Sequence, residues 1–229
     1  TVVNAVAIIL GGLLGAYAIP GLPRHIERTL TAGISLSVLL IGVKMAWQTE
    51  NIVIPLLSLV VGGIAGEILA IESRLEAVGR AVERWVGPTR GDFTRGFVTA
   101  TLLFCVGAMA VMGAIEGGLR GDHSILFAKA VLDGTMAVVF ASTLGIGVAL
   151  SALPVFLYQG SIALAAGLIS SVLSGTMVAE MTATGGIIIL GVALNILGTT
   201  DIRVGNLLPA VVVAPVLVAL WGHLGALVP

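Results

Sequence analysis

The chain has 229 residues, of which 58% are hydrophobic and only 10% charged, with a net charge of −1 and a mean hydropathy of +1.13. Soluble domains carry about 25% charged residues, so this composition argues against a soluble globular protein and predicts an all-α, polytopic helical membrane protein. The near-neutral charge gives no indication of nucleic-acid binding. The single cysteine, Cys105, excludes an intramolecular disulfide and a cysteine-based metal cluster.

Eight apolar segments are long enough to be transmembrane helices, since crossing a bilayer takes about 20 apolar residues. They cover residues 2–19, 29–48, 51–70, 94–115, 124–150, 152–171, 177–198 and 203–227. The divisions at 150–152 and 171–177 are the hardest to place, because neither connection carries charge. The first segment lacks a basic leader region, so we expect a retained span rather than a cleaved signal. We predict a single transmembrane domain over residues 1–229.

One segment of this domain, residues 71–95, is rich in charge. Its apolar residues recur at helical spacing with Glu and Arg between them, which is typical of an amphipathic helix lying in the cytoplasmic membrane interface. A plain charged connector is the alternative.

The arginines predict the orientation of the spans. With eight spans, the loops on one side hold Arg24, Arg28, Arg74, Arg80, Arg84, Arg90, Arg95 and Arg203. The other side holds Arg120, with Lys44 and Lys129 near span ends. Cytoplasmic loops carry the excess of Lys and Arg, so we expect both termini to lie outside.

An internal repeat links distant spans. Residues 40–52 (LIGVKMAWQTENI) resemble residues 189–202 (ILGVALNILGTTDI), which lie five spans later. An odd displacement turns the second copy upside down relative to the first. A fainter match joins 99–105 (TATLLFC) to 135–141 (TMAVVFA). We therefore predict an inverted repeat relating spans 1–3 to spans 6–8 and span 4 to span 5, a common device of secondary transporters.

Polar residues and glycines gather at the start of span 7. They are Glu180, Thr182, Thr184, Gly185 and Gly186, and Gly33 occupies the corresponding place in span 2. A helix broken at Gly185-Gly186 would expose backbone groups that could hold a solute or ion beside the threonine hydroxyls. Alternatively, the glycines form a packing notch and the hydroxyls bond to the preceding turn. Glu180 itself is interpreted as an ion ligand or as a helix-capping carboxylate.

Asp133 lies about ten residues into span 5, near the bilayer midplane. A charge there costs about 2.5–3.5 kcal/mol on insertion scales. We interpret Asp133, with Thr135 close by, as a proton or cation site. The alternative is an aspartate held by neighbouring hydroxyls or by Lys129, one turn earlier on the same helix face.

Other polar residues at a suitable depth would line the pathway or join helices. These are Thr99, Cys105, Ser142, Thr143 and Asn195. Lys44 and Glu67, near span ends, are candidate gating charges. Lys44 could pair with Asp133 or Glu180, or extend to the interface.

Enzyme motifs are absent: there is no GxSxG, HExxH or Walker sequence, and the three histidines do not cluster. We therefore expect no catalytic activity, no metal site, no cofactor and no ATP-driven pumping by this chain.

Several segments resemble one known family. AIILGGLLG (7–15), LIGVKMAWQTENI (40–52), GFVTATLLFCVGAMAVMG (96–113), STLGIGVALSALPVFLYQG (142–160) and RVGNLLPA (203–210) are similar to the YqgA-like family of bacterial inner-membrane proteins, a family of unknown function. The resemblance covers essentially the whole chain. It implies a bacterial plasma-membrane protein and supplies no substrate.

Together these patterns favour an ion-coupled secondary transporter of a small solute, driven by H⁺ or Na⁺, with alternating access around a midplane site. An oligomeric channel and a membrane scaffold or sensor are the alternatives. The abundance of glycine, with 31 residues, suggests close helix packing and a homodimer.

Overall fold

The computed structural model describes residues 1–18, 24–86, 92–106 and 108–225, and these residues form helices joined by short connections. The first half contains α1 (Val2–Ala18), α2 (Arg24–Ala46), α3 (Val53–Leu69), α4 (Ile71–Val86), α5 (Phe93–Cys105) and α6 (Ala108–Arg120). The second half contains α7 (Ser124–Leu144), α8 (Gly147–Leu150), α9 (Ala152–Leu164), α10 (Ala166–Ser170), α11 (Gly175–Leu197), the 3₁₀ helix η1 (Val204–Leu207) and α12 (Pro209–Gly225). The predicted all-α class is confirmed.

Four helical segments among the described residues are long and apolar enough to cross a membrane. They are Ser124–Leu144, Gly147–Leu164, Gly175–Leu197 and Val204–Trp221. The number rises to six if the bent pairs α3–α4 and α5–α6 each form one span. The helix α1 and the apolar part of α2 are shorter. The transmembrane character is thus supported, whereas the count of eight spans stays a prediction.

The boundary between the fifth and sixth predicted spans lies earlier than the expected position at 150–152. Gly145 ends α7 with a φ of 87°, and the next apolar segment begins at Gly147. A positive φ is accessible to glycine without the steric cost that a Cβ brings, so Gly145 stops the helix within an uninterrupted apolar run. The hydropathy pattern alone could not place this turn.

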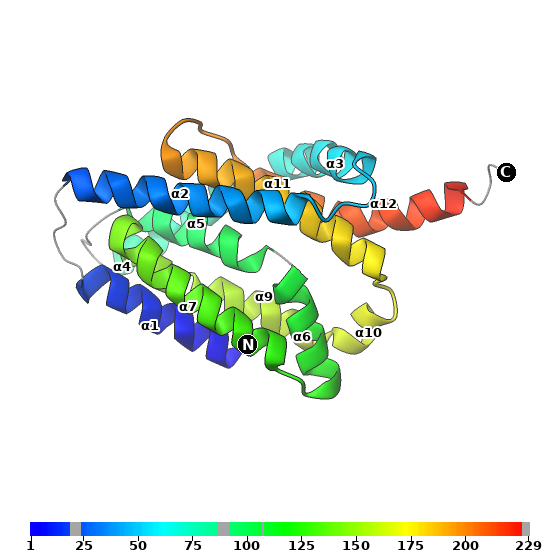
Figure 1. Cartoon of the computed structure of the whole chain (residues 1–229), viewed down its shortest axis with the longest axis horizontal. Helices are drawn as coiled ribbons and strands as arrows, with labels where there is room; N and C mark the ends of the chain where they lie inside the picture. Colours follow the sequence, from blue (N-terminus) through cyan, green and yellow to red (C-terminus); the bar gives the residue numbers. More distant parts are fainter. Residues whose placement is uncertain (19–23, 87–91, 107, 226–229) are drawn as a thin grey trace.

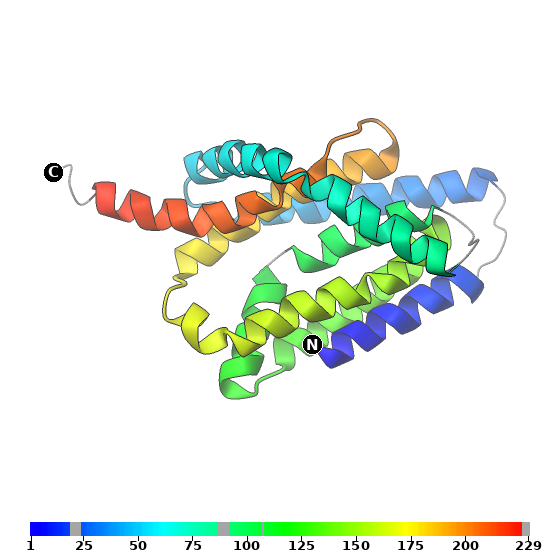
Figure 2. The ribbon, with the colours of Figure 1, turned by 180° about the vertical axis from the view of Figure 1, so that it is seen from behind.

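Three helix pairs organise the molecule: α1 with α7, α2 with α11, and α3 with α12 (Figures 1 and 2). Small residues allow the backbones of each pair to approach closely. Gly11 faces Gly134, and Gly15 faces Val138, so α1 and α7 run in the same direction.

The other two pairs are antiparallel. Gly42 of α2 faces Gly186 of α11, and an added Cβ on either glycine would lie 2.9 or 2.7 Å from the carbonyl oxygen of the other. In α3, Gly62 faces Ala210, and Gly66 faces Asn206. These contacts leave no room for side chains at the crossing points, so glycine is required there by packing.

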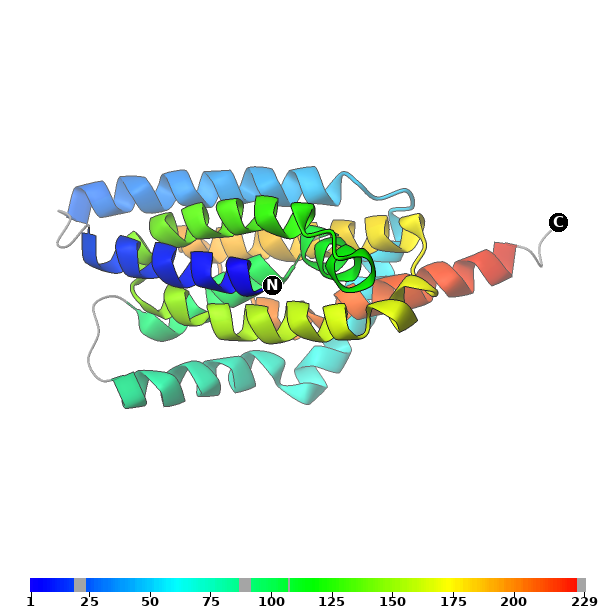
Figure 3. The same cartoon turned by 90° about the horizontal axis from the view of Figure 1, so that it is seen from below.

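The helix α4 comprises residues 71–86 of the charged segment 71–95, which the sequence predicts as an amphipathic helix. It lies along one edge of the molecule (Figure 3). Residues 87–91 of the predicted connector, including Arg90, are outside the described residues. The buried apolar core includes Phe93, Phe104 and Phe140, which belong to α5 and α7.

The two ends of the helical bundle are distinct. The arginine end carries the α4–α5, α7–α8 and α11–η1 connections and includes Arg80, Arg95 and Arg203. The opposite end carries the α2–α3 and α6–α7 connections. The first residues of α1 and the C-terminal part of α12 both point away from the arginine end, and α12 projects beyond its neighbours.

Candidate functional site

A buried polar cluster joins α1, α7 and α9. Lys129 and Asp133, one turn apart on α7, form an ion pair at 2.9 Å. The Asn4 side-chain amide donates to Asp133 Oδ2 at 3.0 Å and lies 3.4 Å from Gln159 Oε1. Asn4 and Gln159 are 0% exposed, and both charged residues are 6% exposed.

The two carboxamides of this cluster are incompletely bonded. Asn4 Oδ1 and Gln159 Nε2 are buried and have no hydrogen-bond partner among the described residues. Buried polar atoms are usually satisfied, and unpaired ones call for an explanation. The cluster therefore retains one free acceptor and one free donor, which could take part in binding a proton, an ion or a polar group.

The helices α5 and α6 form a bent pair that packs on the helices of this cluster. The axes of the two helices are inclined by 61°, and Val106, which follows α5, has an extended backbone with φ −83° and ψ 132°. Both helices pack on α7 and α9, which carry Lys129, Asp133 and Gln159. Inside a membrane, non-helical backbone is tolerated only where protein or a water-filled cavity surrounds it.

The sequence placed the helix break elsewhere. The helix α11 runs through Gly185 and Gly186 without interruption, so the predicted break there is wrong. The backbone of α2 occupies the space next to Gly186. Gly185 packs against Val106, beside the bend that the structure places after α5. The alternative of a packing notch describes these glycines.

The hydroxyls near these glycines bond within their own helix. Thr182 donates to the Val178 carbonyl at 2.7 Å, and Thr184 donates to the Glu180 carbonyl at 2.8 Å. An added Cβ at Gly33 would meet no atom within 4 Å, so this glycine faces open space. The predicted cradle of Gly33 with the start of span 7 is not assembled.

Glu180 is 0% exposed and connects α11 to the α2–α3 loop at the opposite end. Its carboxylate accepts hydrogen bonds from Thr49 Oγ1 at 2.8 Å, from Glu50 N at 2.7 Å and from Asn51 N at 2.9 Å. The carboxylate thus binds backbone amides of a distant loop rather than capping its own helix. Lys44 is exposed and does not approach either predicted partner within ion-pair distance, whereas Asp133 pairs with Lys129.

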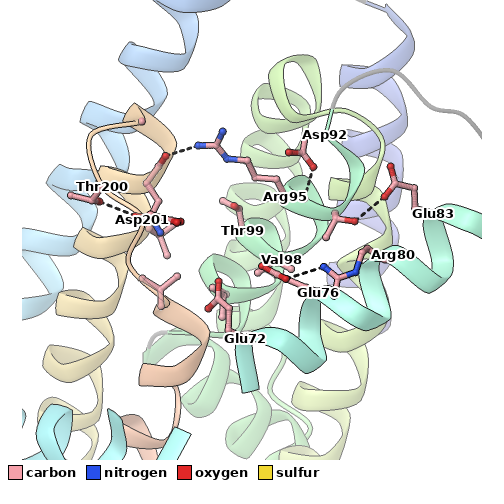
Figure 4. Close-up of a pocket in the computed structure, with 16 residues that line it drawn as sticks. Glu72, Glu76, Arg80, Glu83, Asp92, Arg95, Val98, Thr99, Thr200 and Asp201 are labelled. Atoms are coloured by element: carbon pink, nitrogen blue, oxygen red, sulfur yellow. Dashed lines mark hydrogen bonds and ion pairs between the residues drawn. The ribbon is translucent and has the colours of Figure 1, made fainter. Parts of the chain in front are cut away.

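A cavity of about 640 Å³ opens at the arginine end, between α4, α5 and the end of α11 (Figure 4). Charged residues surround it: Glu72, Glu76, Arg80, Glu83, Asp92, Arg95 and Asp201. Its apolar lining comes from Val98, Leu102, Val192 and Val204. Two sequence-predicted residues, Thr99 and Asn195, also line the cavity.

Hydrogen bonds fix the walls of this cavity. Asp92 caps α5 by accepting from the Arg95 amide at 3.0 Å, as expected of an N-cap aspartate. The Arg95 guanidinium donates to the Asn195 carbonyl, and the Asn195 side chain accepts from the Ile202 amide at 2.9 Å. Arg80 pairs with Glu76 at 2.9 Å.

A second network joins α3, α4 and η1 beside the cavity. Asn206 accepts from the Glu72 amide at 2.8 Å and donates to Glu67 Oε2 at 2.6 Å. Glu67 also pairs with Arg203 at 2.7 Å, and the Gly205 amide donates to Glu72. Glu67, predicted as a gating charge, therefore helps to hold the α3–α4 junction against η1.

The remaining predicted residues lie apart from the cavity. Thr135 is exposed and donates to the Val131 carbonyl. Ser142 and Thr143 donate to the carbonyls of Val139 and Phe140. Cys105 is partly buried at the end of α5.

Two features escaped the sequence interpretation. Asn4 meets Asp133 and Gln159 only through tertiary packing, and the α5–α6 bend has no proline to announce it. The one local signal is Gly107, which follows Val106 within the apolar run. In the described residues, no three His, Cys, Asp or Glu side chains come together as a metal-ion site would require.

Long apolar helices packed through glycines, with ionisable groups buried among them, define a polytopic helical membrane protein. The family model described as "Protein of unknown function (DUF554)" matches residues 1–219, and the chain belongs to this family. The resemblance noted in the sequence is thereby confirmed.

Two curated relatives align with nearly the whole chain. "Uncharacterized membrane protein YdfK" of Bacillus subtilis (strain 168) is 32% identical over 222 residues, covering 95% of this chain and 94% of the relative. "Uncharacterized protein YqgA" of Escherichia coli (strain K12) is 34% identical over 224 residues, covering 96% and 95%. No solved structure matches the chain significantly.

Proposed function

We propose that this protein is a secondary transporter of a small solute, coupled to H⁺ or Na⁺ and working by alternating access. One observation carries the proposal: the bent α5–α6 pair packs on α7, the helix that carries the buried Lys129–Asp133 pair. Discontinuous helices beside intramembrane charges are the usual construction of transporter binding sites.

The two ends of the molecule suit opposite roles in such a cycle. The cavity at the arginine end is lined in part by Leu102, one helical turn before Val106. At the opposite end, Glu180 binds the α2–α3 loop to α11. In the proposed cycle the protein is therefore open at the arginine end and closed at the other.

The excess of arginine assigns the open end to the cytoplasm, because cytoplasmic loops are enriched in Lys and Arg. The two curated relatives come from bacteria, so the proposed location is the bacterial plasma membrane with both termini outside. The antiparallel α2–α11 and α3–α12 pairs support the proposed inverted repeat, since these are the helices that it relates. A homodimer through exposed apolar faces completes the proposal.

In this scheme Asp133 is the coupling group. Protonation or cation binding at its carboxylate would weaken the pair with Lys129 and leave the ammonium without its partner. The free atoms Asn4 Oδ1 and Gln159 Nε2 lie in the same cluster and could stabilise the altered arrangement. Two states of the cluster would then favour two packings of α7 against α1 and α9.

The test is flux in proteoliposomes containing the purified chain. We expect saturable movement of one solute class from a panel of amino acids, organic acids, amines and inorganic ions, driven by a proton or sodium gradient. Non-saturating flux independent of the gradient would indicate a channel. Flux of no compound, from protein that is folded by thermal unfolding, would contradict transport and favour a scaffold or sensor.

Asp133 is tested separately by Asp133→Asn, which should abolish coupling or shift its pH dependence. Thr135→Ala is the matched control on the same helix, because the Thr135 side chain is exposed and bonds only to its own helix. An unchanged pH dependence in D133N would remove Asp133 from the mechanism while leaving the carrier intact.

A further inference from the structure

We propose that the cavity at the arginine end binds an organic cation, an ammonium group carried on a small apolar body, and that this is the solute class of the carrier. The inference rests on the proposed transport function for its physiological meaning. The binding site itself is argued from the cavity, its charges and one buried hydroxyl.

The lining of the cavity is strongly acidic. Five carboxylates face two guanidinium groups among the described residues, leaving three negative charges in excess. Both arginines already have partners, since Arg80 pairs with Glu76 and Arg95 donates to the Asn195 carbonyl. Clefts lined by one sign of charge between low-dielectric walls concentrate the opposite ion, so a cation is favoured over an anion.

Thr99 marks the inner part of the cavity. Thr99 is only 9% exposed and lines the cavity from α5 (Figure 4). No hydrogen bond joins its hydroxyl to any residue that the structure describes. Most other hydroxyls in the helices bond to the preceding turn, as Thr182 and Thr184 do. Thr99 thus offers an unused polar contact within a mostly buried wall.

Val98, Leu102 and Val192 also line the cavity, and we refer to this apolar part of the lining as its floor. A volume of about 640 Å³ lies within the range of small-molecule sites, which are mostly apolar with a few placed polar groups. An organic cation matches both the apolar and the acidic parts of the lining. Its apolar body covers the floor, and its ammonium group meets the carboxylates and the Thr99 hydroxyl. A bare metal ion would leave the floor uncovered.

The test is isothermal titration of the full chain in detergent with tetraethylammonium and putrescine. Sodium glutarate and magnesium chloride serve as the anion and metal-ion probes. We expect saturable binding of at least one organic cation, weakening as sodium chloride is raised from 50 to about 300 mM, since salt screens exposed charges. Binding of glutarate or magnesium in place of both organic cations would overturn the proposal.

Two variants locate the binding. Thr99→Val keeps the shape of the side chain and removes the hydroxyl, and Asp201→Asn removes one exposed charge at the rim. Each should weaken binding about three- to tenfold, the range expected for one hydrogen bond or charge contact, with little change in melting temperature. Thr135→Val, which alters an exposed hydroxyl on α7, should leave the affinity unchanged. Unchanged affinity in both T99V and D201N would place the binding elsewhere and overturn the proposal.

The outcomes also separate this inference from the transport proposal. Cation binding that is sensitive to T99V and D201N, without flux in proteoliposomes, upholds the site and contradicts the carrier. Gradient-driven flux of an anion or neutral solute, with no binding of organic cations, upholds the carrier and contradicts the assigned solute class.

Discussion

The two ends of the molecule use carboxylates in different ways. At the end of the bundle opposite the arginine end, one fully buried carboxylate, Glu180, accepts three hydrogen bonds from the α2–α3 loop. At the arginine end, five carboxylates surround a cavity, and the bonds they make hold the cavity walls rather than fill the space. The comparison teaches that the same chemical group ties a loop to a helix at one end and lines a cavity at the other. Variants at each end, and at the cluster between them, test this contrast.

The largest effect is expected between the two ends, at the buried pair. Lys129→Ala leaves the Asp133 carboxylate buried without its partner, and breaking such a pair costs about 3–5 kcal/mol. The measurement is thermal unfolding of the purified protein in detergent. The double variant K129A/D133A should recover part of the loss, because it removes both charges. A melting temperature of K129A equal to that of the wild type would contradict the burial of the pair.

The next largest effect is expected at the closed end. Glu180→Ala removes three charge-assisted hydrogen bonds and should cost about 3 kcal/mol, because the loop amides can partly rehydrate. Glu180→Gln keeps one accepting oxygen and should cost less. Asp201→Asn at the arginine end is the matched control and should change stability by under about 0.5 kcal/mol, since Asp201 is exposed. Equal effects of E180A and D201N would remove the contrast between the ends.

An intermediate effect is expected where α2 crosses α11. Gly186→Ala places a methyl group against the Gly42 carbonyl and the Ala46 amide, and overpacking of this kind costs about 1–3 kcal/mol. Gly33→Ala on α2 meets open space and should stabilise the helix by about 0.5–1 kcal/mol. A lower melting temperature for G186A and a higher one for G33A would support the close crossing of α2 and α11. Equal effects would argue against it.

The smallest effect is expected at the exposed ion pair of the arginine end. The side chains of Arg203 and Glu67 are 70% and 57% exposed, so Arg203→Ala should cost under about 1 kcal/mol. Asn206→Ala should cost more, because Asn206 is buried and bonds both the Glu72 amide and Glu67. A larger loss in R203A than in N206A would show that the exposed pair, rather than the buried amide, holds the α3–α4 junction against η1.

Local features of the structure could be predicted from the sequence, and tertiary contacts could not. The pairing of Asp133 with Lys129 follows from helical spacing and was available as an alternative, as was the back-bonding of Thr182 and Thr184. The all-α class follows from composition. These inferences need only the period of a helix and the cost of charge in an apolar medium.

The features that the sequence did not predict share one physical cause: each depends on contacts between residues that are distant in sequence. Asn4 lies 129 residues from Asp133, and Glu180 lies 130 residues from Glu50, so no local pattern connects them. Gly185 and Gly186 suggested a broken helix because glycine weakens helices, yet close contact with α2 and Val106 explains them. The bend after α5 falls in an apolar run without proline and therefore gave no sign in the hydropathy.

The crossing of Gly42 and Gly186 has a mechanical consequence. Two backbones that touch without intervening side chains form a pivot, where α11 can tilt against α2 with the least loss of contact. Gly186 lies eleven residues from Leu197, a lever of about 16 Å, so a tilt of about 10° would displace the helix end by about 3 Å. Glu180 and Asn195 stand on opposite arms of this lever. Any tilt that moves Glu180 away from the α2–α3 loop would therefore move Asn195, which lines the cavity, in the opposite direction.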